Sequence, residues 1–282
     1  MKIKSIHEIE KPLETYNLHV KNNHNYIANN LVISNCHGLR GQILKDIMCG
    51  PLAHVPIRWA FTGTIPKEQF EIINLTITIG EVVHQLRTVD LQEKGIISKC
   101  NVNVLQLIDT REFSDYAGEY DYLVTDEKRL QFIIDHIITL STTGNVLVLV
   151  GRTETGKALS KMIPDSVFLS GATKSSVRRQ HYDEVATTNS KVIVATSGIA
   201  AVGLDIPRIN HLVMIESGKS FVKNIQSIGR ALRTSHDKNH ATIWDICSTC
   251  RFSKKHLTSR KKYYAEQQFP YKITKIDWQN KG

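Results

Sequence analysis

The stretch Val146-Leu-Val-Leu-Val150, followed by Gly151-Arg-Thr-Glu-Thr-Gly-Lys-Ala158, decides the fold. Five consecutive apolar residues that end at a glycine are typical of a strand buried on both faces. Three similar runs follow it, and stretches with helical spacing separate them. Such an alternation predicts a parallel sheet whose two faces are both covered. The runs are residues 192–195, 211–215 and 241–246, and the helices are residues 155–162, 175–187 and 222–233.

The residues just before this stretch predict a helix that opens a second domain. Thr125 has a side chain suited to an N-cap, and Asp126 and Glu127 follow in the first turn, where they favour the helix dipole. Apolar residues then repeat at helical spacing and give the helix one apolar face. These residues are Leu130, Ile133, Ile134, Ile137 and Ile138.

Length and composition predict a two-domain globular protein of the cytoplasm. The chain has 282 residues, of which 41% are hydrophobic and 22% charged. No apolar run approaches the roughly 20 residues that span a bilayer, and no N-terminal signal pattern occurs. The five cysteines form no framework, and the lone Cys247-Ser-Thr-Cys250 pair indicates two thiols at a strand end. A net charge of +9 fits either a polyanionic partner or a solvated basic surface.

The first 125 residues predict a less regular organisation. Residues 1–35 have the pattern of short strands with Asn-rich turns. A short helix is expected at 39–48, stopped by Gly50-Pro51, and buried strands at 57–61 and 81–86. Residues 101–124 are polar, and we expect them to connect two domains.

Ligands of open parallel sheets bind at the carboxyl ends of the strands, so the loops at those ends are the candidate sites. Gly151–Lys157 matches the phosphate-binding GxxxxGK pattern, but Ala158 replaces the hydroxyl residue that holds magnesium. A second loop runs from Val194 to Asp205, and its small residues allow backbone to approach a phosphate or sugar. The alternative for this loop is a tight strand–helix turn.

The third loop carries the most specific pattern, Gln226-Ser-Ile-Gly-Arg-Ala-Leu-Arg233. Gln226, Arg230 and Arg233 are spaced i, i+4 and i+7, so they share one face of a helix. Two guanidinium groups beside an amide suit a multiply charged phosphate group, which each Arg can bind with two hydrogen bonds.

These patterns resemble the second RecA-like domain of superfamily 2 (DExH-type) helicases, and most closely the UvsW-type recombination helicases of tailed phages. Gln226-x-x-Gly-Arg-x-x-Arg233 matches motif VI, Ala195-Thr-Ser…Gly203-Leu-Asp205 matches motif V, and Thr62-Gly-Thr64 matches motif III. The resemblance runs in motif order over residues 36–250. It places Gly151–Lys157 at motif IV, which accounts for the missing hydroxyl.

The helicase resemblance implies a role for each matched residue. Arg230 and Arg233 would stabilise charge on the γ-phosphoryl group of ATP. Nucleic acid would be contacted by Gly171 and Thr196, and Thr62 and Thr64 would couple it to the nucleotide state. ATP-binding residues are expected to be Gly203, Asp205, Gln226, Gly229, Arg230 and Arg233.

A separate chemistry is indicated at Asn35-Cys36. An Asn side-chain amide can attack its own backbone carbonyl, form a succinimide and cut the chain, and a following thiol can accept an acyl group. The run Glu14–Asn35 resembles the C-terminal splicing block of inteins, with His24-Asn-Tyr before the last strand. The resemblance implies that Asn35 cyclises, Cys36 accepts the acyl group and His24 assists proton transfer.

The splicing block departs from the intein pattern in three places. Asn17 replaces a usual Asp, Asn30 a common Gly and Ser34 a common His. Loss of the Asp removes a candidate acid–base group. Cys36-His37 would complete an Asp-Glu-Cys-His motif II whose acidic residues lie upstream of the junction, so the intein would interrupt the ATPase motif itself.

The sequence therefore predicts an α/β RecA-like helicase domain preceded by a small all-β intein segment. We expect the C-terminal part of a DNA helicase, with RNA left open, that is completed by a split-intein partner carrying the upstream fragment. ATP and Mg²⁺ would be held mainly by that fragment, with no metal ligand in this chain and no membrane partner. If the gene is phage-encoded, the protein would work in the host cytoplasm. The expected divisions are 1–35 intein, 36–100 end of the first helicase domain, 101–124 connection and 125–282 second domain.

Two other readings stay open. The chain could be a truncated nucleic-acid-binding module without ATPase, or a stand-alone NTPase that uses Lys157. The tail from Lys254 to Tyr264 mixes basic and aromatic residues, so it fits either a DNA contact that stacks on bases or a solvated helix.

Overall fold

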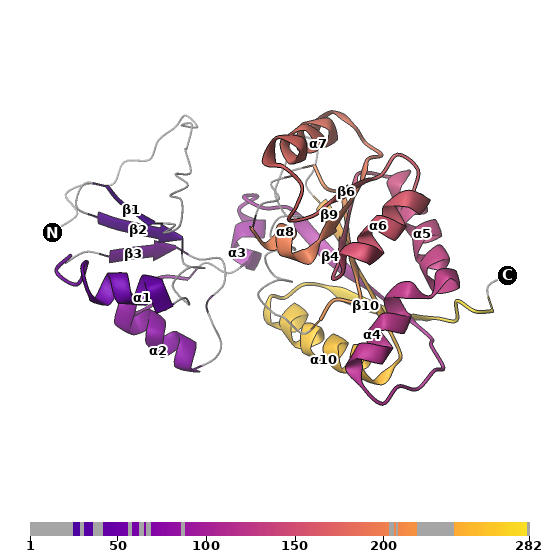
Figure 1. Ribbon diagram of the computed structural model, residues 1–282, viewed down its shortest axis with the longest axis horizontal. Coiled ribbons are helices and arrows are strands. Elements are labelled where there is room, and N and C mark those ends of the chain that lie inside the picture. Colours follow the sequence, from indigo (N-terminus) through magenta and orange to yellow (C-terminus); the bar gives the residue numbers. More distant parts are fainter. Residues whose placement is uncertain are drawn as a thin grey trace. The chain divides into compact units, whose positions relative to one another are not determined.

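The structure of the protein is a computed structural model with two compact units, Met1–Gln85 and Leu86–Gly282 (Figure 1). It describes residues 25–28, 31–35, 42–55, 58–61, 65, 69–85, 88–202, 206, 208–218 and 240–280. Each unit is described by itself below.

The second unit is built on a seven-stranded sheet with the order β10-β4-β9-β8-β5-β7-β6. Every neighbouring pair in it is parallel. The predicted runs form its centre, because most of their side chains are apolar and are stabilised by burial on both faces. The strands are β4 (Lys99–Leu107), β5 (Val146–Val150), β6 (Val167–Leu169), β7 (Val192–Thr196), β8 (His211–Ile215), β9 (His240–Ser248) and β10 (Tyr271–Ile276).

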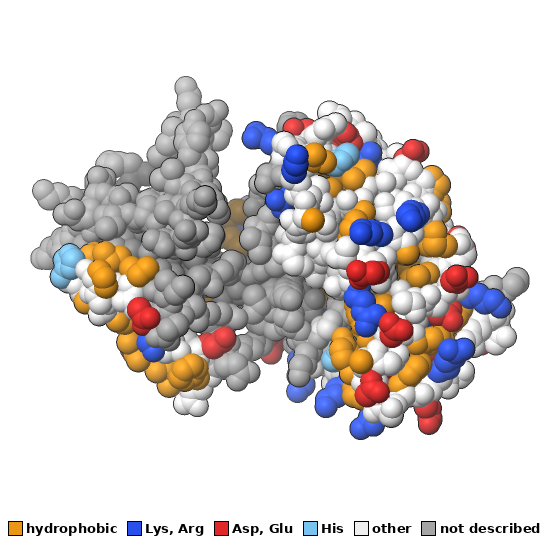
Figure 2. All heavy atoms as spheres, viewed as in Figure 1, with side chains coloured by type: hydrophobic (Ala, Val, Ile, Leu, Met, Phe, Trp, Pro, Cys, Tyr) orange, Lys and Arg blue, Asp and Glu red, His pale blue; other side chains and the backbone are white. Residues whose placement is uncertain are grey.

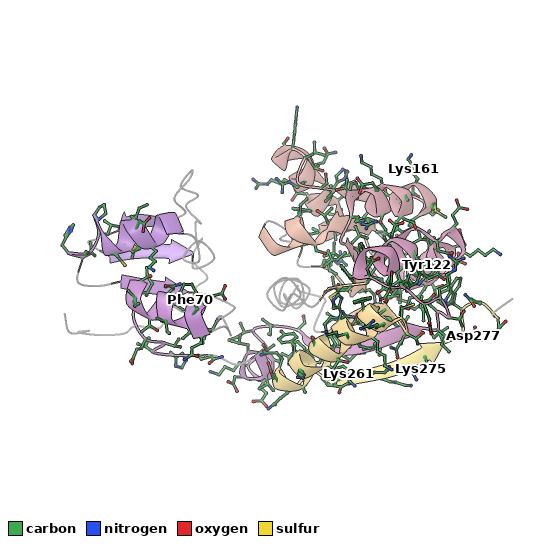
Figure 3. All side chains as sticks on the ribbon, turned by 60° about the horizontal axis from the view of Figure 1, so that its bottom comes forward. Phe70, Tyr122, Lys161, Lys261, Lys275 and Asp277 are labelled. Carbon is green, nitrogen blue, oxygen red and sulfur yellow. The ribbon has the colours of Figure 1, made fainter. Side chains whose placement is uncertain are left out.

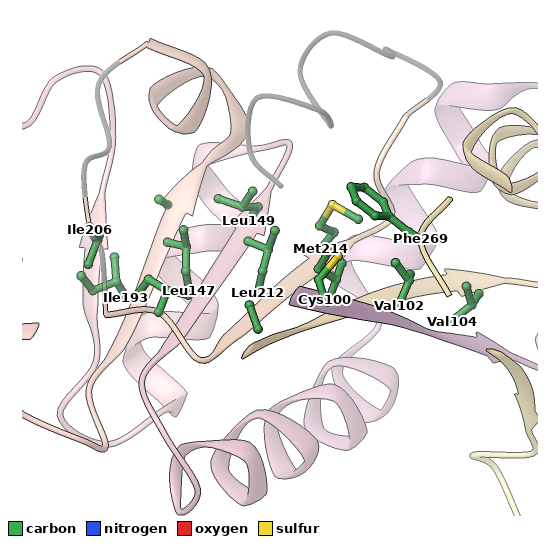
Figure 4. Packing of buried hydrophobic residues seen from close by; sticks show 14 of the residues in the cluster. Cys100, Val102, Val104, Leu147, Leu149, Ile193, Ile206, Leu212, Met214 and Phe269 are labelled. Carbon is green, nitrogen blue, oxygen red and sulfur yellow. The ribbon is translucent and has the colours of Figure 1, made fainter. Parts of the chain in front are cut away.

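Helices cover both faces of this sheet, which confirms the predicted α/β parallel architecture (Figure 1). One core contains side chains of α7, α8 and α10, and Figure 4 shows its strand residues with Phe269 packed beside Met214. The core on the other face contains side chains of α5 and α6. The helices are α3 (Thr88–Glu93), α4 (Tyr116–Thr125), α5 (Glu127–Ser141), α6 (Thr153–Met162), α7 (Ser175–Thr187), α8 (Ser197–Val202) and α10 (Arg251–Glu266).

The cap of α5 lies one residue later than predicted. Asp126, not Thr125, is the N-cap, and its carboxylate accepts from the Arg129 N–H at 2.9 Å. Thr125 instead ends α4. The predicted apolar face is buried except for Ile138, which is 37% exposed. At 100° per residue, Ile138 lies at the margin of the face that Ile134 and Ile137 bury.

The predicted connection at 101–124 is wrong, because these residues form part of the second unit. β4 lies between β10 and β9 and pairs with β9 along its whole length, from Lys99 opposite His240 to Leu107 opposite Ser248. Asn101 and Asn103 interrupt its apolar residues, so the strand lacks the continuous run that marked the others. The second unit accordingly begins at Leu86, not at residue 125.

The first unit contains a three-stranded sheet and two helices. β1 (Asn25–Ala28) and β2 (Leu31–Asn35) are antiparallel, and β2 pairs in parallel with β3 (Arg58–Phe61). Of the strands predicted within 1–35, the two that lie in the described residues, β1 and β2, therefore share a sheet with a downstream strand. α1 (Gln42–Cys49) ends directly before Gly50, one residue later than predicted, whereas 81–85 hold no strand and α2 (Gln69–Thr78) was not expected. Met48 and Leu75 belong to the apolar cluster of this unit.

In the part of the chain that the structure describes, no helix has the length and apolarity needed to cross a bilayer.

The packing of α5 predicts a contrast between two adjacent isoleucines. Ile137→Ala should lower the free energy of unfolding by roughly 2–5 kcal/mol, because Ile137 is fully buried and its loss leaves a cavity. Ile138→Ala, the matched control, should cost less than about 1 kcal/mol, because that side chain already meets water. Urea denaturation followed by circular dichroism measures both. Equal losses would contradict the orientation of α5.

Candidate functional site

The carboxyl ends of the seven strands meet at one edge of the sheet, where parallel α/β folds bind ligands. Two of the predicted site residues lie there on neighbouring strands. Thr196 ends β7, and Gly171 follows the end of β6, whose Leu169 is the register partner of Ala195. Gly171 is exposed, and no neighbouring atom lies near the position that a Cβ would take. The backbone at this point is therefore open to a ligand.

A side-chain hydroxyl stabilises the turn after β6. The Ser170 N–H donates to Thr173 Oγ1 at 2.9 Å, and the Thr173 N–H donates to the Ser170 carbonyl at 2.9 Å. At the end of β7, Ser197 Oγ donates to the Val150 carbonyl at 3.1 Å and ties the start of α8 to β5. These bonds fix the positions of the loops that carry Gly171 and Thr196.

The Gly151–Lys157 loop does not have the form of a phosphate cradle. Such a cradle needs backbone N–H groups that point into an open loop. Here α6 begins at Thr153, and the Gly156 N–H donates to the Arg152 carbonyl at 3.2 Å. Gly156 is buried against Phe168, and Lys157 is exposed.

Arg152 has a structural partner at the same loop. Its guanidinium binds Asp121 at 2.5 Å and lies 4.9 Å from the ring centre of Tyr120. The Tyr120 hydroxyl lies against Gly151, and burial raises the pKa of that phenol to about 12. The loop is thus packed by its own neighbours.

A buried charge network lies at the ends of β4 and β8. Arg129 on α5 is fully buried, and it donates through Nε to Asp109 Oδ2 at 3.3 Å and through Nη2 to Glu216 Oε1 at 2.5 Å. Its third contact is Nη1 to the Leu123 carbonyl at 2.5 Å. One guanidinium thereby joins two strand ends and the end of α4.

Both carboxylates make further hydrogen bonds. Asp109 accepts from Ser248 Oγ at 2.6 Å and from Trp278 Nε1 at 3.1 Å, and Glu216 accepts from Ser253 Oγ at 2.6 Å. Burial raises the pKa of Glu216, although Arg129 acts against this shift. Burial also opposes the charge of Arg129, but Glu216 and Asp109 outweigh it and raise the pKa of the guanidinium.

A second buried pair holds the segment that follows β8. Arg260 on α10 donates to both carboxylate oxygens of Asp245 at 2.8 Å, and Tyr264 donates to Asp245 at 2.8 Å. Arg260 Nη1 also donates to the Ser217 carbonyl. At the other end of α10, Glu119 accepts from the N–H groups of Phe252 and Ser253, which satisfies the start of the helix.

These contacts correct the prediction for the tail. Arg260, Tyr263 and Tyr264 are buried, so the aromatic rings are core residues and present no stacking surface. The helix is not fully solvated either. Cys247 and Cys250 are buried and free, and burial raises the pKa of both thiols, which disfavours the reactive thiolate. Among the described residues, no group of three or more His, Cys, Asp or Glu is placed to hold a metal.

Most of the other predicted site residues lie outside the described residues. Asn35 is described as the last residue of β2, opposite Phe61 of β3. The residues that fall outside are His24, Cys36, His37, Thr62, Thr64, Gly203, Asp205, Gln226, Gly229, Arg230 and Arg233.

Sequence reasoning missed the residues of the charge network. One available signal was Arg129, a charge among the apolar residues of α5, and another was Glu216, a charge directly after a buried strand. Neither signal identifies the partner, because Asp109 and Glu216 are 107 positions apart and meet only in the folded sheet.

Comparison with known proteins gives the class of this domain. Residues 128–235 match the family described as the helicase conserved C-terminal domain. Over these residues the chain is similar to a helicase C-terminal domain, and its parallel sheet with helices on both faces agrees with the RecA-like fold that the resemblance predicted.

Individual relatives are more distant. The chain is 24% identical over 239 residues to the ATP-dependent DNA helicase UvsW of Enterobacteria phage T4, covering 81% of this chain and 47% of the relative. It is 26% identical to the putative helicase 22 of a Sulfolobus islandicus filamentous virus, covering 78% of this chain and 42% of that protein. The chain thus spans less than half the length of these two relatives.

Solved helicase structures share the fold. The crystal structure of T4 UvsW matches with a TM-score of 0.56 at 19% identity, over 87% of this chain and 53% of that one. S. cerevisiae Dbp5 bound to RNA and ADP BeF3 matches with a TM-score of 0.59 at 15% identity, over 88% of this chain and 59% of that one.

The charge network predicts that replacing Arg129 lowers the free energy of unfolding far more than replacing Arg152. Arg129→Met should lower the free energy of unfolding by roughly 3–5 kcal/mol, because it leaves Asp109 and Glu216 buried without a cation. Arg152→Met, the control, should cost less than about 1 kcal/mol, because its pair with Asp121 is exposed. Urea denaturation at pH 7 measures both.

The stability loss caused by Arg129→Met should depend on pH. Without Arg129, the folded-state pKa of Glu216 rises further above its unfolded value, so the stability deficit grows as pH rises from 5 to 8. A deficit that is equal at both pH values would show that Glu216 does not carry the buried charge.

Proposed function

We propose that this chain is the C-terminal part of an ATP-dependent DNA helicase whose upstream part is joined to it by protein splicing at Asn35-Cys36. The match of residues 128–235 to the helicase C-terminal domain carries the helicase half of the proposal. The product would couple ATP hydrolysis to DNA unwinding or branch migration, as expected of a protein related to UvsW. RNA is the alternative nucleic acid.

Arg230 and Arg233 are proposed to act on ATP from this domain. Their segment follows β8, and the Arg260 contact to Ser217 supports a fixed start for it. Two guanidinium groups three positions apart in the sequence would neutralise charge that develops on the γ-phosphoryl group. Gln226 and Gly229 of the same segment, with Gly203 and Asp205 after α8, would bind the rest of the nucleotide. Mg²⁺ would be held by the upstream part, which supplies the acidic residues of motif II.

Nucleic acid is proposed to bind at the carboxyl ends of β6 and β7. The exposed Gly171 and the neighbouring Thr196 support this, because a backbone without side chains lets a phosphate approach N–H groups closely. Thr62 and Thr64, which follow β3, would report the nucleotide state from the first unit.

Splicing is proposed to proceed through Asn35. Its side-chain nitrogen attacks its own backbone carbonyl carbon, the Asn35–Cys36 peptide bond breaks, and the Cys36 amine is released. Cys36 already carries the upstream acyl group on its sulfur, and that group then moves to the free nitrogen, while His24 assists proton transfer. The β1–β2 hairpin, which ends at Asn35, supports the proposed strand pattern before the junction. His37 would then stand beside Cys36 in the restored motif II.

Two alternatives make different predictions. A nucleic-acid-binding module without ATPase would bind DNA but never regain hydrolysis. A stand-alone NTPase would use Lys157, and the geometry of the Gly151–Lys157 loop speaks against it because the Gly156 N–H is already bonded within α6.

Splicing is tested by mixing the chain with a folded N-terminal intein half that carries the upstream helicase segment. Mass spectrometry should show release of residues 1–35 and a new peptide bond to Cys36. Asn35→Ala should block release, because alanine has no amide to cyclise, and Cys36→Ala should block ligation while slow cleavage after Asn35 continues. Asn22→Ala is the control and should splice. An unchanged mass with the native chain would sink the splicing half of the proposal.

The nucleotide role is tested in the ligated product. Arg230→Ala or Arg233→Ala should lower kcat for ATP by roughly three orders of magnitude, as expected for arginines that contact the transferred phosphoryl group, while DNA binding persists. Lys157→Ala should leave kcat within about twofold. Loss of hydrolysis in the Lys157 variant, with normal turnover in both arginine variants, would promote the stand-alone NTPase reading.

A further inference from the structure

The positive charge of the chain is concentrated at its C-terminal end. Residues 251–282 contain nine Lys and Arg against two Asp and Glu, a net charge of +7 out of +9 for the whole chain. The other 250 residues are therefore close to neutral, at +2. A general preference for basic residues along the chain does not account for such a distribution.

Most basic residues of helix α10 lie on one exposed face. At 100° per residue, Arg251, Lys254, Lys255 and Lys262 fall within about 60° of one line, and all four are exposed. Lys261 borders this stripe and is partly exposed. Figure 2 shows Lys and Arg side chains along the border of the unit where Figure 1 has α10. The opposite side of the helix buries Leu257, Tyr263, Tyr264 and Arg260.

Strand β10 extends the basic surface. The ring of Tyr271 lies near that of Tyr264 on α10, with ring centres 6.0 Å apart. The alternation of side chains along a strand therefore places Lys275 on the side of the sheet that α10 covers. Lys275 is exposed, and Figure 3 shows it on β10 alongside α10 with Lys261. We call Arg251, Lys254, Lys255, Lys261, Lys262 and Lys275 the α10–β10 basic face.

The basic residues that form ion pairs within the described part of the chain are Arg129, Arg152, His181, Lys191 and Arg260, and none of them belongs to the α10–β10 basic face. Glu266, which is exposed and lies four residues after Lys262, offsets part of the charge of this face. The inward contacts of Arg260 and Tyr264 hold the helix in place, so its outer charges are presented on a rigid element. Like charges kept together on a rigid surface repel one another, and a polyanion relieves that repulsion.

We infer that the α10–β10 basic face binds the phosphate backbone of DNA without reading its bases. From Arg251 to Lys262 the stripe is about 16 Å long, and that length of duplex carries roughly ten phosphates. Ammonium groups bind phosphates as point charges, and Tyr263 and Tyr264 are buried, so neither ring is a platform for base stacking. The basic face lies at the β10-β4 end of the strand order, whereas Gly171 and Thr196 lie at the β7-β6 end. It is thus a second contact surface, additional to the one in the proposed function.

The full chain, with fluorescein-labelled 20-base-pair duplex DNA, tests this inference by anisotropy. The triple variant Lys254→Glu, Lys255→Glu and Lys262→Glu should weaken binding at least tenfold. The slope of log K against log salt should fall by about three, since each lost phosphate contact removes roughly one. Duplexes of unrelated sequence should behave alike. Thermal unfolding should be unchanged, because all three side chains are exposed.

The matched control variant replaces Lys128, Lys157 and Lys161 with Glu. These three side chains are also exposed, and the control has the same net charge as the α10 variant. It should bind within about threefold of the native chain. If both triple variants weaken binding equally, net charge alone is responsible and the inference is wrong. It is also wrong if the α10 variant binds DNA normally but loses binding to vesicles rich in phosphatidylserine, which would assign the face to a membrane surface. Splicing and ATP turnover report separately on the proposed function.

Discussion

The guanidinium of Arg129 is the contact on which the carboxyl edge of the seven-stranded sheet depends. It joins Asp109 at the end of β4 to Glu216 at the end of β8 and also binds the last turn of α4. Burying two carboxylates is costly unless a cation and hydrogen-bond donors satisfy them, and here Ser248, Ser253 and Trp278 supply the remaining donors. The network therefore holds together the ends of β4 and β8, which lie on either side of β9 at the carboxyl edge of the sheet.

Helix α10 connects this network to the rest of the domain. Its inner side supplies Ser253 to Glu216 and Arg260 to Asp245 and Ser217, so it sets the direction in which the chain leaves β8. The segment that leaves there carries the proposed ATP-contacting arginines. The outer side of the same helix carries the basic residues, so structural and electrostatic roles are separated by face.

The sequence predicted the parts of the fold in which one residue type dominates. The continuous apolar runs of β5, β7 and β8 were identified within a residue of their ends, and so was α7. β4 was mistaken for a connection because its asparagines broke the run, and β10 was not anticipated because nearly all its side chains are exposed. Edge strands and mixed strands are defined by their partners, which a single sequence does not show.

The candidate site was predictable to a different degree. Motif order predicted Gly171 and Thr196 as contacts of nucleic acid, and the structure brings them to adjacent strand ends, while their role stays a prediction. The ion pairs of Arg129 and Arg260 were not foreseen, because their partners lie 20, 87 and 15 positions away and pair only after folding. The aromatic residues of the tail were assigned to a surface because composition does not reveal which side of a helix is buried.

The central claim, that this chain carries one half of an ATPase and gains the other half by splicing, is tested most directly by ATP turnover before and after ligation. The chain alone should hydrolyse no ATP with or without DNA, and the ligated product should hydrolyse it in a DNA-stimulated manner. Hydrolysis by the chain alone, or a correctly ligated product without DNA-stimulated turnover, would contradict the account.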